Sequence, residues 1–333
     1  MRALILKEHG DLDKLELVHD KPVPVPEDGE VLIRTGASSF NYHDIFTVRG
    51  MPGIKVPLPK VIGLDIAGTV VGNRGDWRDG DRVMVNPLRA GIGLMGEMLD
   101  GGMQEYVAVS ADQLFRIPDN VSFYQAAALP VAYGTAHRML VTHNTVKPGD
   151  KVLILGASGG VGTASVIIAK MLGAEVIACA GSDEKCARLK ELGADHTVNY
   201  NTTDFVRYVI GVYGKPERRT FNGGVDVLVN FTGGETWARS LKTVKRGGSI
   251  LVCGATAGYD PKEDLRYIWT FELNVKGSNS FYRDNLTGLL DMVSEGKFNP
   301  VIDSVLPLEK AVDGLALIRD RKVIGKIVVD PAL

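Results

Sequence analysis

A glycine-rich segment, Gly156–Gly162, is the part of the sequence best suited to bind a charged ligand. Ala157, Gly159 and Gly162 fill the pattern G-x-G-x-x-G, with alanine in place of the first glycine. The segment directly follows a strand-like apolar run, Lys151–Leu155, and leads into a helical pattern. In that setting glycines let the backbone turn tightly and approach a pyrophosphate, and the helix N-terminus supplies N–H donors and a positive dipole end. We therefore expect a dinucleotide to contact Gly156, Ser158, Gly159, Gly160 and Val161.

The residues after the next strand indicate which dinucleotide is bound. An NAD site places a carboxylate about 20 residues beyond the glycine-rich turn, where it accepts a hydrogen bond from the adenosine ribose. Here that position holds Ala180, followed by Gly181 and Ser182, with Lys185 one helical turn further on. A small residue leaves room for a phosphate, and a hydroxyl and an ammonium can donate to it. The sequence therefore favours NADP(H), held by Gly181, Ser182 and Lys185.

Both interpretations have an alternative. The glycine-rich segment can be an ordinary strand-to-helix turn, although its flanking strand and helix and the strand–helix repeats that follow favour a dinucleotide site. Asp183 and Glu184 can supply the carboxylate of an NAD site, in which case Ser182 and Lys185 only cap and solvate the start of a helix.

The elements that must position these residues change in character near residue 121. Up to about that point, short β-type runs are broken by Pro and Gly, whereas from Ser122 apolar strands alternate with helical patterns. Alternating strands and helices imply right-handed crossovers and a doubly wound parallel sheet. The strands expected there are Lys151–Gly156, Glu175–Ala180, Val225–Asn230, Ser249–Gly254 and Asn274–Ser278.

The end of the chain returns to β character. A helix is expected around Arg283–Lys297, and Pro300–Pro307 and Gly325–Asp330 have the composition of further strands. We therefore predict an α/β protein in which a Rossmann domain, residues 122–282, is inserted into a β-rich domain formed by residues 1–121 and 283–333.

Composition and charge exclude several other kinds of protein. Of the 333 residues, 38 are Lys or Arg and 40 are Asp or Glu, so the net charge of -2 offers no basic field for nucleic acid or an anionic membrane. The three cysteines, Cys179, Cys186 and Cys253, have no C-x-x-C spacing, which argues against a disulfide framework or a cysteine metal site. No apolar run reaches the ~20 residues of a membrane span. We expect a cytoplasmic protein with neither a membrane nor a nucleic-acid partner.

Motifs along nearly the whole chain resemble those of the medium-chain dehydrogenase/reductase family. Each motif is weak alone, but their order and spacing together are specific. They are Ser39–Asp44, Gly63–Gly72, Gly80–Val83, Gly102–Val107, Ala128–Leu140, Val146–Gly162, Leu192–Tyr200, Leu289–Pro300 and Gly325–Val329. The resemblance implies that the β-rich domain is the GroES-like catalytic domain of that family and that the inserted domain binds a nicotinamide cofactor.

The zinc ligands of the family's alcohol dehydrogenases are missing from the matching segments. Those segments carry Asn41, Leu64 and Val131, none of which suits Zn²⁺ in this setting. The lobe that holds four structural-zinc cysteines in those enzymes is replaced by Asn86–Gly102, which contains no cysteine. The chain therefore resembles the zinc-independent branch of quinone oxidoreductases, enone reductases and enoyl-thioester reductases, and we expect no bound metal.

The resemblance also implies roles for residues beside the nicotinamide. Asn41 matches such a position, and its amide can donate a hydrogen bond to a substrate carbonyl. His43 matches a hydroxyl of the alcohol dehydrogenases' proton relay, so it is a candidate proton donor, with a hydrogen-bonded structural side chain as the alternative. Tyr42 and Tyr133 are further candidate donors, with a place in the cleft wall as their alternative.

Further residues carry over position by position. Asp44 is expected to pair with Lys326 as supporting structure rather than for catalysis. Relatives often dimerise through the edge strands of their cofactor domains, here near Asn274–Ser280, so a homodimer is expected. The remaining cofactor contacts are Thr135 toward the nicotinamide, Tyr200 and Arg321 toward the adenosine phosphate, and Thr232, Gly254 and Ala255 at the ends of later strands.

Together these features predict a zinc-independent, NADPH-dependent reductase of quinones or α,β-unsaturated carbonyl compounds, acting on a small molecule in the cleft between the domains. Such a reduction needs a positioned hydride, a donor for the developing oxyanion and a proton source. One alternative is an enoyl-thioester (acyl-CoA) reductase, in which Lys215, Arg218, Arg219 or Arg89 meets a nucleotide or phosphopantetheine arm. Another is an NADPH-binding sensor or interaction protein that has kept the fold without turnover.

Overall fold

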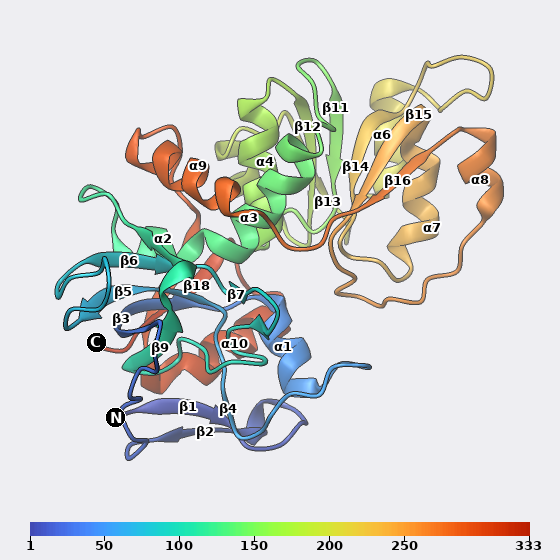
Figure 1. Ribbon diagram of the computed structural model, residues 1–333. Helices are drawn as coiled ribbons and strands as arrows, with labels where there is room; N and C mark the ends of the chain where they lie inside the picture. The colour runs from blue at the N-terminus through green and yellow to red at the C-terminus, as the bar shows by residue number, and fades with distance from the viewer. The chain divides into compact units, whose positions relative to one another are not determined.

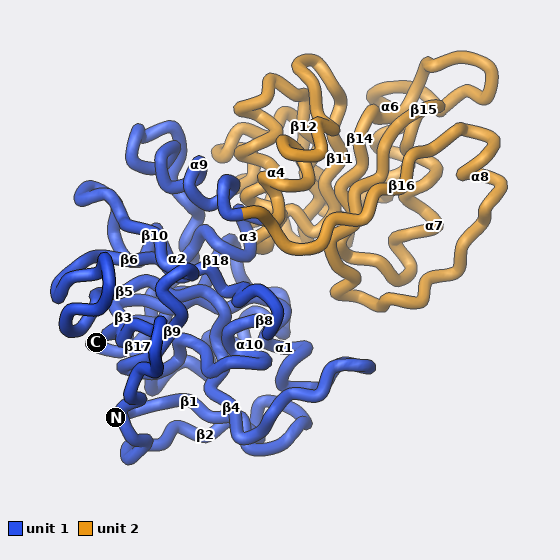
Figure 2. The backbone as a smooth tube through the Cα atoms, viewed as in Figure 1, with its two compact units in different colours: residues 1–134, 283–333 blue, residues 135–282 orange.

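The computed structural model describes residues 1–333, and Figure 2 shows the two units into which the chain divides. Unit 1 comprises residues 1–134 and 283–333, and unit 2 comprises residues 135–282. One join falls between residues 282 and 283. The other falls after Gly134 rather than after Val121, because the helix α2 (Phe123–Ala128) packs against the sheet of unit 1.

Unit 1 is built mainly from β-strands. They are β1 (Ala3–Leu6), β2 (Leu15–Val18), β3 (Glu30–Ser39), β4 (Lys60–Val61), β5 (Asp65–Val71), β6 (Arg82–Val85), β7 (Leu88–Arg89), β8 (Gly93–Leu94), β9 (Tyr106–Ser110), β10 (Leu114–Arg116), β17 (Ile302–Pro307) and β18 (Lys326–Asp330). A seven-stranded sheet has the order β10-β6-β5-β3-β18-β17, with β9 also paired to β3, and a smaller sheet has the order β2-β1-β4. Because β18 pairs with β3, the end of the chain completes a sheet that the first half begins.

Unit 1 also contains helices, of which α2 packs on β3 and β5 (Figure 1). Besides α2 they are α1 (Tyr42–Arg49), α9 (Arg283–Ser294) and α10 (Ala311–Arg319), while α3 (Pro130–His137) crosses the join. One apolar core lies among β1, α1 and α10 and includes Leu4, Ile45 and Leu315, each at most 1% exposed. This core fixes α1, whose first turn carries the candidate catalytic residues Tyr42 and His43.

Unit 2 contains a single sheet of six parallel strands. They are β11 (Lys151–Ile154), β12 (Glu175–Ala180), β13 (His196–Asn199), β14 (Val225–Val229), β15 (Val244–Val252) and β16 (Asn274–Gly277), in the order β13-β12-β11-β14-β15-β16. The chain winds outward from β11 in one direction and from β14 in the other. Ligands of open α/β sheets bind at such a reversal, beyond the carboxyl ends of the strands.

The helices of unit 2 connect these strands. They are α4 (Gly160–Met171), α5 (Asp183–Glu191), α6 (Phe205–Tyr213), α7 (Thr236–Ser240) and α8 (Leu265–Thr270). Helix α4 packs against β11 and β12, and α5 packs against β12 and β13, as right-handed crossovers require. The predicted α/β class, with a doubly wound parallel sheet inserted into a β-rich domain, is confirmed. Strand β13 is not among the strands expected from the sequence. No helix of the structure combines the length and the apolar character needed to cross a bilayer.

Candidate active site

The glycine-rich turn joins the end of β11 to the start of α4 in unit 2. Gly156 has a φ of 67°, a left-handed conformation that favours glycine. A Cβ atom at Gly162 would lie 2.5 Å from the carbonyl oxygen of Gly156, so a side chain there would separate α4 from the turn. At Gly159, by contrast, the nearest atom to a Cβ would be 3.8 Å away. No side chain caps the first turn of α4, and its N–H groups therefore suit a pyrophosphate placed beside Ser158, Gly160 and Val161.

A second group of predicted cofactor contacts gathers where β12 meets α5. Strand β12 ends at Ala180, as expected from the sequence. A Cβ atom at Gly181 would lie 2.7 Å from the hydroxyl of Tyr200, so Tyr200 packs directly against Gly181. The Oγ atom of Ser182 accepts a hydrogen bond from the backbone N–H of Lys185 at 3.2 Å and caps α5. The structure thus brings the predicted phosphate-binding residues of unit 2 together.

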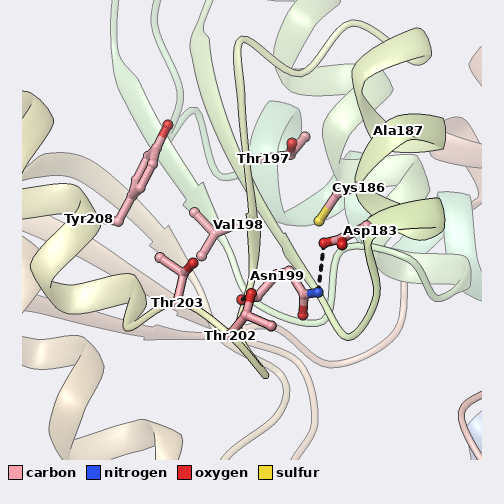
Figure 3. Close-up of a pocket in the computed structure, with 9 residues that line it drawn as sticks. All are labelled: Asp183, Cys186, Ala187, Thr197, Val198, Asn199, Thr202, Thr203 and Tyr208. Carbon is pink, nitrogen blue, oxygen red and sulfur yellow. Dashed lines mark hydrogen bonds between the residues drawn. The ribbon is translucent and has the colours of Figure 1, made fainter.

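Asp183, the alternative source of a ribose carboxylate, is bonded to a neighbouring strand end. Its Oδ1 atom accepts a hydrogen bond from Nδ2 of Asn199 at 2.8 Å (Figure 3). Both residues line a cavity of about 360 Å³ that also includes Cys186, Ala187, Thr197, Val198, Thr202, Thr203 and Tyr208. None of the predicted cofactor contacts lines this cavity, which lies at the edge strand β13.

The turns after β14 and β15 hold three more predicted contacts, Thr232, Gly254 and Ala255. Backbone hydrogen bonds join the two turns, from Thr256 to Phe231 at 3.0 Å and from Ala257 to Thr232 at 2.7 Å. A buried residue to which the sequence analysis assigns no role shapes the first turn. Asn230 accepts hydrogen bonds from the N–H groups of Thr232 and Gly233 through Oδ1 and donates from Nδ2 to Ser240, at distances of 3.0 to 3.1 Å. Its signal in the sequence is an asparagine that ends an apolar strand and stands two residues before a Thr-Gly-Gly turn.

In unit 1, a buried polar cluster surrounds the ammonium group of Lys326. The Nζ atom donates hydrogen bonds to Oδ1 of Asn41 at 2.6 Å, to the carbonyl oxygen of Phe40 at 2.7 Å and to Oδ2 of Asp65 at 3.1 Å. Nδ2 of Asn41 donates to the same oxygen of Asp65 at 2.8 Å. Because an ammonium can only donate, Oδ1 of Asn41 must face Lys326, and the orientation of the amide is fixed.

The expected pairing of Asp44 with Lys326 is wrong, since the ion pair of Lys326 is formed with Asp65. Asp44 is the third residue of α1, and its carboxylate turns back to the helix start. It accepts hydrogen bonds from the backbone N–H of Asn41 at 2.8 Å and from that of Gly63 at 2.9 Å. Complete burial raises the pKa of Asp44 to about 6 despite these two bonds.

His43 contacts a carboxylate from a distant part of unit 1. Its Nε2 atom lies 2.6 Å from Oε2 of Glu97. The side chain of His43 is 25% exposed and that of Glu97 is 8% exposed. Glu97 belongs to the lobe Asn86–Gly102 and is a site residue that sequence reasoning missed, because nothing in its local pattern distinguishes it from a surface glutamate.

The other candidate residues lie in different settings. Tyr42 is half-buried, with its ring edge-on to Phe46. Tyr133 is fully buried, and its hydroxyl accepts a hydrogen bond from the N–H of Val301 at 2.7 Å, which favours a structural role. Thr135 is the first residue of unit 2 and is buried. Arg321 belongs to unit 1, where it follows α10 with a φ of 57°, whereas the predicted phosphate-binding residues of the β12–α5 region belong to unit 2.

The side chains present do not fit a zinc site. No group of three or more His, Cys, Asp or Glu side chains is arranged to hold a metal ion. In the segments that match zinc-binding ones, Asn41 and Asp65 both contact the Lys326 ammonium. A dication at that point would face a like charge in a buried environment, which is strongly unfavourable. We therefore derive no catalytic step through a metal.

Two family models match the chain. The alcohol dehydrogenase GroES-like domain matches residues 27–119, and the zinc-binding dehydrogenase model matches residues 160–295. The first match lies within unit 1, and the second includes the sheet of unit 2 from α4 onward. The expected GroES-like domain is thereby confirmed.

Several characterised proteins are similar over nearly the whole chain. The mouse synaptic vesicle membrane protein VAT-1 homolog is 30% identical over 99% of this chain and 84% of its own length. The mouse quinone oxidoreductase is 30% identical over 93% of this chain and 92% of its own length. The crotonyl-CoA reductase of Streptomyces avermitilis is 30% identical over 90% of this chain and 78% of its own length.

Solved structures share the fold. A crystal structure of an NAD-dependent alcohol dehydrogenase superposes with a TM-score of 0.90 at 36% identity and covers 99% of both chains. The 2-octenoyl-CoA carboxylase reductase CinF, solved with NADP and 2-octenoyl-CoA, superposes with a TM-score of 0.86 at 26% identity, over 99% of this chain and 87% of its own.

Proposed function

The chain belongs to the medium-chain dehydrogenase/reductase family, in its quinone oxidoreductase-like branch, and from this premise we propose that it is an NADPH-dependent, zinc-independent reductase of quinones or α,β-unsaturated carbonyl compounds. The observation that carries the proposal is the cluster in which Asn41 and Asp65 contact an ammonium instead of offering ligands to a metal. An alkoxide is far more basic than an enolate and gains more from a Lewis acid, whereas the enolate of a conjugated carbonyl can be stabilised by a hydrogen-bond donor alone.

Asn41 is the donor that this proposal assigns to the substrate's carbonyl oxygen. Its Nδ2 atom carries two hydrogens, and one of them is donated to Asp65, which leaves the second for the substrate. Lys326 holds Oδ1, so the amide cannot rotate to present its acceptor oxygen instead. When bound beside the glycine-rich turn, NADPH would supply the hydride, and His43 is the proposed proton donor.

The preference for NADPH rests on the end of β12. That end carries Ala180 rather than a carboxylate, and the carboxylate of Asp183 is bonded to Asn199. Ser182, Lys185 and Tyr200 offer a hydroxyl, an ammonium and a phenol for a phosphate on the adenosine ribose. One structural neighbour is an NAD enzyme and another is bound to NADP, so the similarity favours neither cofactor. The proposed preference for NADPH rests on the residues of this chain.

The decisive experiment is product analysis with NADPH that carries deuterium in the transferred position. The proposal predicts deuterium on the β-carbon of a reduced enone, and no useful oxidation of ethanol or butanol with NADP⁺. Asn41→Ala should lower kcat more than it raises KM, because the hydrogen bond matters most once charge has developed on oxygen. Deuterium on the carbinol carbon, or rapid alcohol oxidation, would overturn the proposal and indicate an alcohol dehydrogenase instead.

A second candidate, an enoyl-thioester reductase, is favoured by the similarity to a crotonyl-CoA reductase and to CinF. Of the basic residues suited to a nucleotide or phosphopantetheine arm, Arg89 is paired with Glu30 at 2.9 Å, while Lys215, Arg218 and Arg219 lie in the segment between α6 and β14. A panel of quinones, enones and enoyl-CoA esters separates the candidates by their kcat/KM values. A protein that binds NADPH but consumes none with any of them is a sensor.

The proposal includes a cytoplasmic homodimer without membrane or nucleic-acid partners. Strand β16 is the outer strand of the parallel sheet, and all four of its residues are exposed, so its backbone groups are open to pairing with a second copy. Light scattering tests the assembly: a mass of two chains is expected, and Val275→Pro in β16 should yield single chains.

A further inference from the structure

The pair formed by His43 and Glu97 lies apart from the lysine-centred cluster and joins two distant parts of unit 1. His43 is the second residue of α1, and Glu97 lies in the lobe between β8 and β9. Their Nε2 and Oε2 atoms are 2.6 Å apart, a distance typical of a charge-assisted hydrogen bond.

The backbone around Glu97 is tightly fixed. Gly96 has a φ of 72°, and a Cβ atom there would lie 2.9 Å from the backbone nitrogen of Gly63. Gly63 in turn donates a hydrogen bond to Asp44, the neighbour of His43 in α1. The lobe is therefore packed closely against Gly63, and the carboxylate of Asp44 ties Gly63 to the start of α1.

The burial of the two side chains is unequal. Glu97 is 8% exposed, and His43, its ion-pair partner, is 25% exposed. A buried carboxylate needs a compensating partner, and here the imidazole provides it. The exposed remainder of His43 leaves its ring in contact with water, from which it can recover a proton.

We propose that Glu97 is a positioning residue that holds His43 as the proton donor of the reduction. The carboxylate accepts from Nε2–H, so this nitrogen keeps its proton and Nδ1 is the atom that gives one up. The Nδ1–H bond breaks and a bond forms from that proton to the substrate atom that bears the negative charge. The substrate gains a hydride from NADPH and this proton, NADPH becomes NADP⁺, and water reprotonates Nδ1. The inference rests on the proposed function and deepens it.

The test compares three variants of the wild-type protein: Glu97→Gln, Glu97→Ala and Asp100→Asn. Glu97→Gln is also made in a protein that already carries His43→Gln. Asp100 is a matched control, because it is an acidic residue of the same lobe that pairs with Lys21. We expect Glu97→Gln to lower kcat about tenfold with an unchanged Kd for NADPH, and Glu97→Ala to lower it further. In the His43→Gln background the same Glu97→Gln change should cost less than about twofold, since the residue has nothing left to position. Asp100→Asn should stay within about twofold of the wild type.

Equal losses from Glu97→Gln in both backgrounds, or an equal loss from Asp100→Asn, would mean that the lobe merely supports the fold and would overturn the inference. A second readout needs no activity: nitrogen NMR of the labelled histidines should show that His43, in its neutral form after Nδ1 has lost its proton, keeps the remaining proton on Nε2, and that Glu97→Ala loses this preference. A preference that survives in Glu97→Ala would overturn the pairing. If the wild type reduces no conjugated carbonyl, the proposed function fails, whereas the NMR result still decides the pairing separately.

Discussion

The glycine-rich turn of unit 2 and the lysine-centred cluster of unit 1 differ in how far apart their parts lie in the chain. The turn is made within Gly156–Gly162, and its working groups are backbone atoms. The cluster joins Asn41, Asp65 and Lys326, with Lys326 placed 285 and 261 positions from its two side-chain partners. The turn depends on the absence of side chains, whereas the cluster depends on the charges that side chains carry. Different substitutions should therefore damage each.

Removing the cation from the cluster should have the largest effect on stability. Lys326 and Asp65 have side chains 2% and 0% exposed, so Lys326→Met would leave a buried carboxylate without its partner. We expect a loss of about 3–5 kcal/mol in the free energy of unfolding, measured with urea. Lys310→Met is the control, because Lys310 pairs with Asp313 at the surface and its loss should cost less than about 1 kcal/mol. Similar losses in both variants would show that the buried pair contributes no more than an exposed one.

The raised pKa of Asp44 predicts a pH dependence in the same region. The native state binds this proton more tightly than the unfolded state, whose carboxyl has its ordinary pKa near 3.8, so stability should fall as pH rises from about 4 to about 6. A difference of about two pKa units corresponds to about 2–3 kcal/mol. Asp44→Asn cannot titrate, so the wild type should lose this amount relative to the variant between pH 4 and pH 7. A constant difference between the two across that range would contradict the assignment to Asp44.

The sequence predicts the glycine-rich turn better than it predicts the lysine-centred cluster. The residues of the turn are contiguous in the chain, whereas those of the cluster are far apart. The strand, turn and helix around Gly159 are contiguous, so their pattern is readable and the structure agrees with it. The cluster is not contiguous: Asp44 and Asp65 both lie more than 200 positions from Lys326, and only the fold decides which of them pairs with it. Glu97 is missed similarly, because it reaches His43 across 54 positions.

The secondary structure and the unit boundaries likewise depend partly on local sequence patterns and partly on long-range packing. Strand β13 is short and partly polar, with the sequence His-Thr-Val-Asn, so it lacks the apolar run by which β11, β12, β14 and β15 are recognised. The first domain boundary shifts because residues 123–128 have a helical pattern typical of the following unit, yet as α2 they pack on β3 and β5 of unit 1. Local patterns give the type of an element, whereas long-range packing decides where it belongs.

In unit 2, losing one charged side chain should change the choice of cofactor rather than the fold. A charge-assisted hydrogen bond contributes about 1.5–3 kcal/mol, so Lys185→Ala should weaken NADPH binding about ten- to a hundredfold. NADH lacks the phosphate, and its affinity should barely change. Fluorescence titration of both cofactors measures this. Equal weakening of the two would mean that Lys185 supports the fold and that the phosphate is bound elsewhere.

Adding a single carbon to the glycine-rich turn should separate its role in folding from its role in binding a pyrophosphate. Gly162→Ala would place a Cβ atom 2.5 Å from a backbone oxygen and should cost about 1–3 kcal/mol of stability. Gly159→Ala meets nothing closer than 3.8 Å, so it should fold normally but obstruct the space where a pyrophosphate is expected, and weaken NADPH binding. Gly288→Ala in α9, with open space around it, is the control and should change neither property. Normal folding of Gly162→Ala would show that the backbone of the turn yields more easily than its contacts indicate.

Chelation should have the smallest effect of all, and it tests the cluster against the zinc sites of related enzymes. Asn41 offers a neutral amide, Asp65 is the cluster's one carboxylate, and both already contact the Lys326 ammonium. Zn²⁺ would have to displace that cation and bind with too few ligands, so metal analysis should find less than one zinc per chain. Prolonged exposure to EDTA or 1,10-phenanthroline should leave both kcat with an enone and the melting temperature unchanged. If a chelator removes one equivalent of zinc and abolishes activity together, then a metal ion, rather than the Lys326 ammonium, is the charge that organises this cluster.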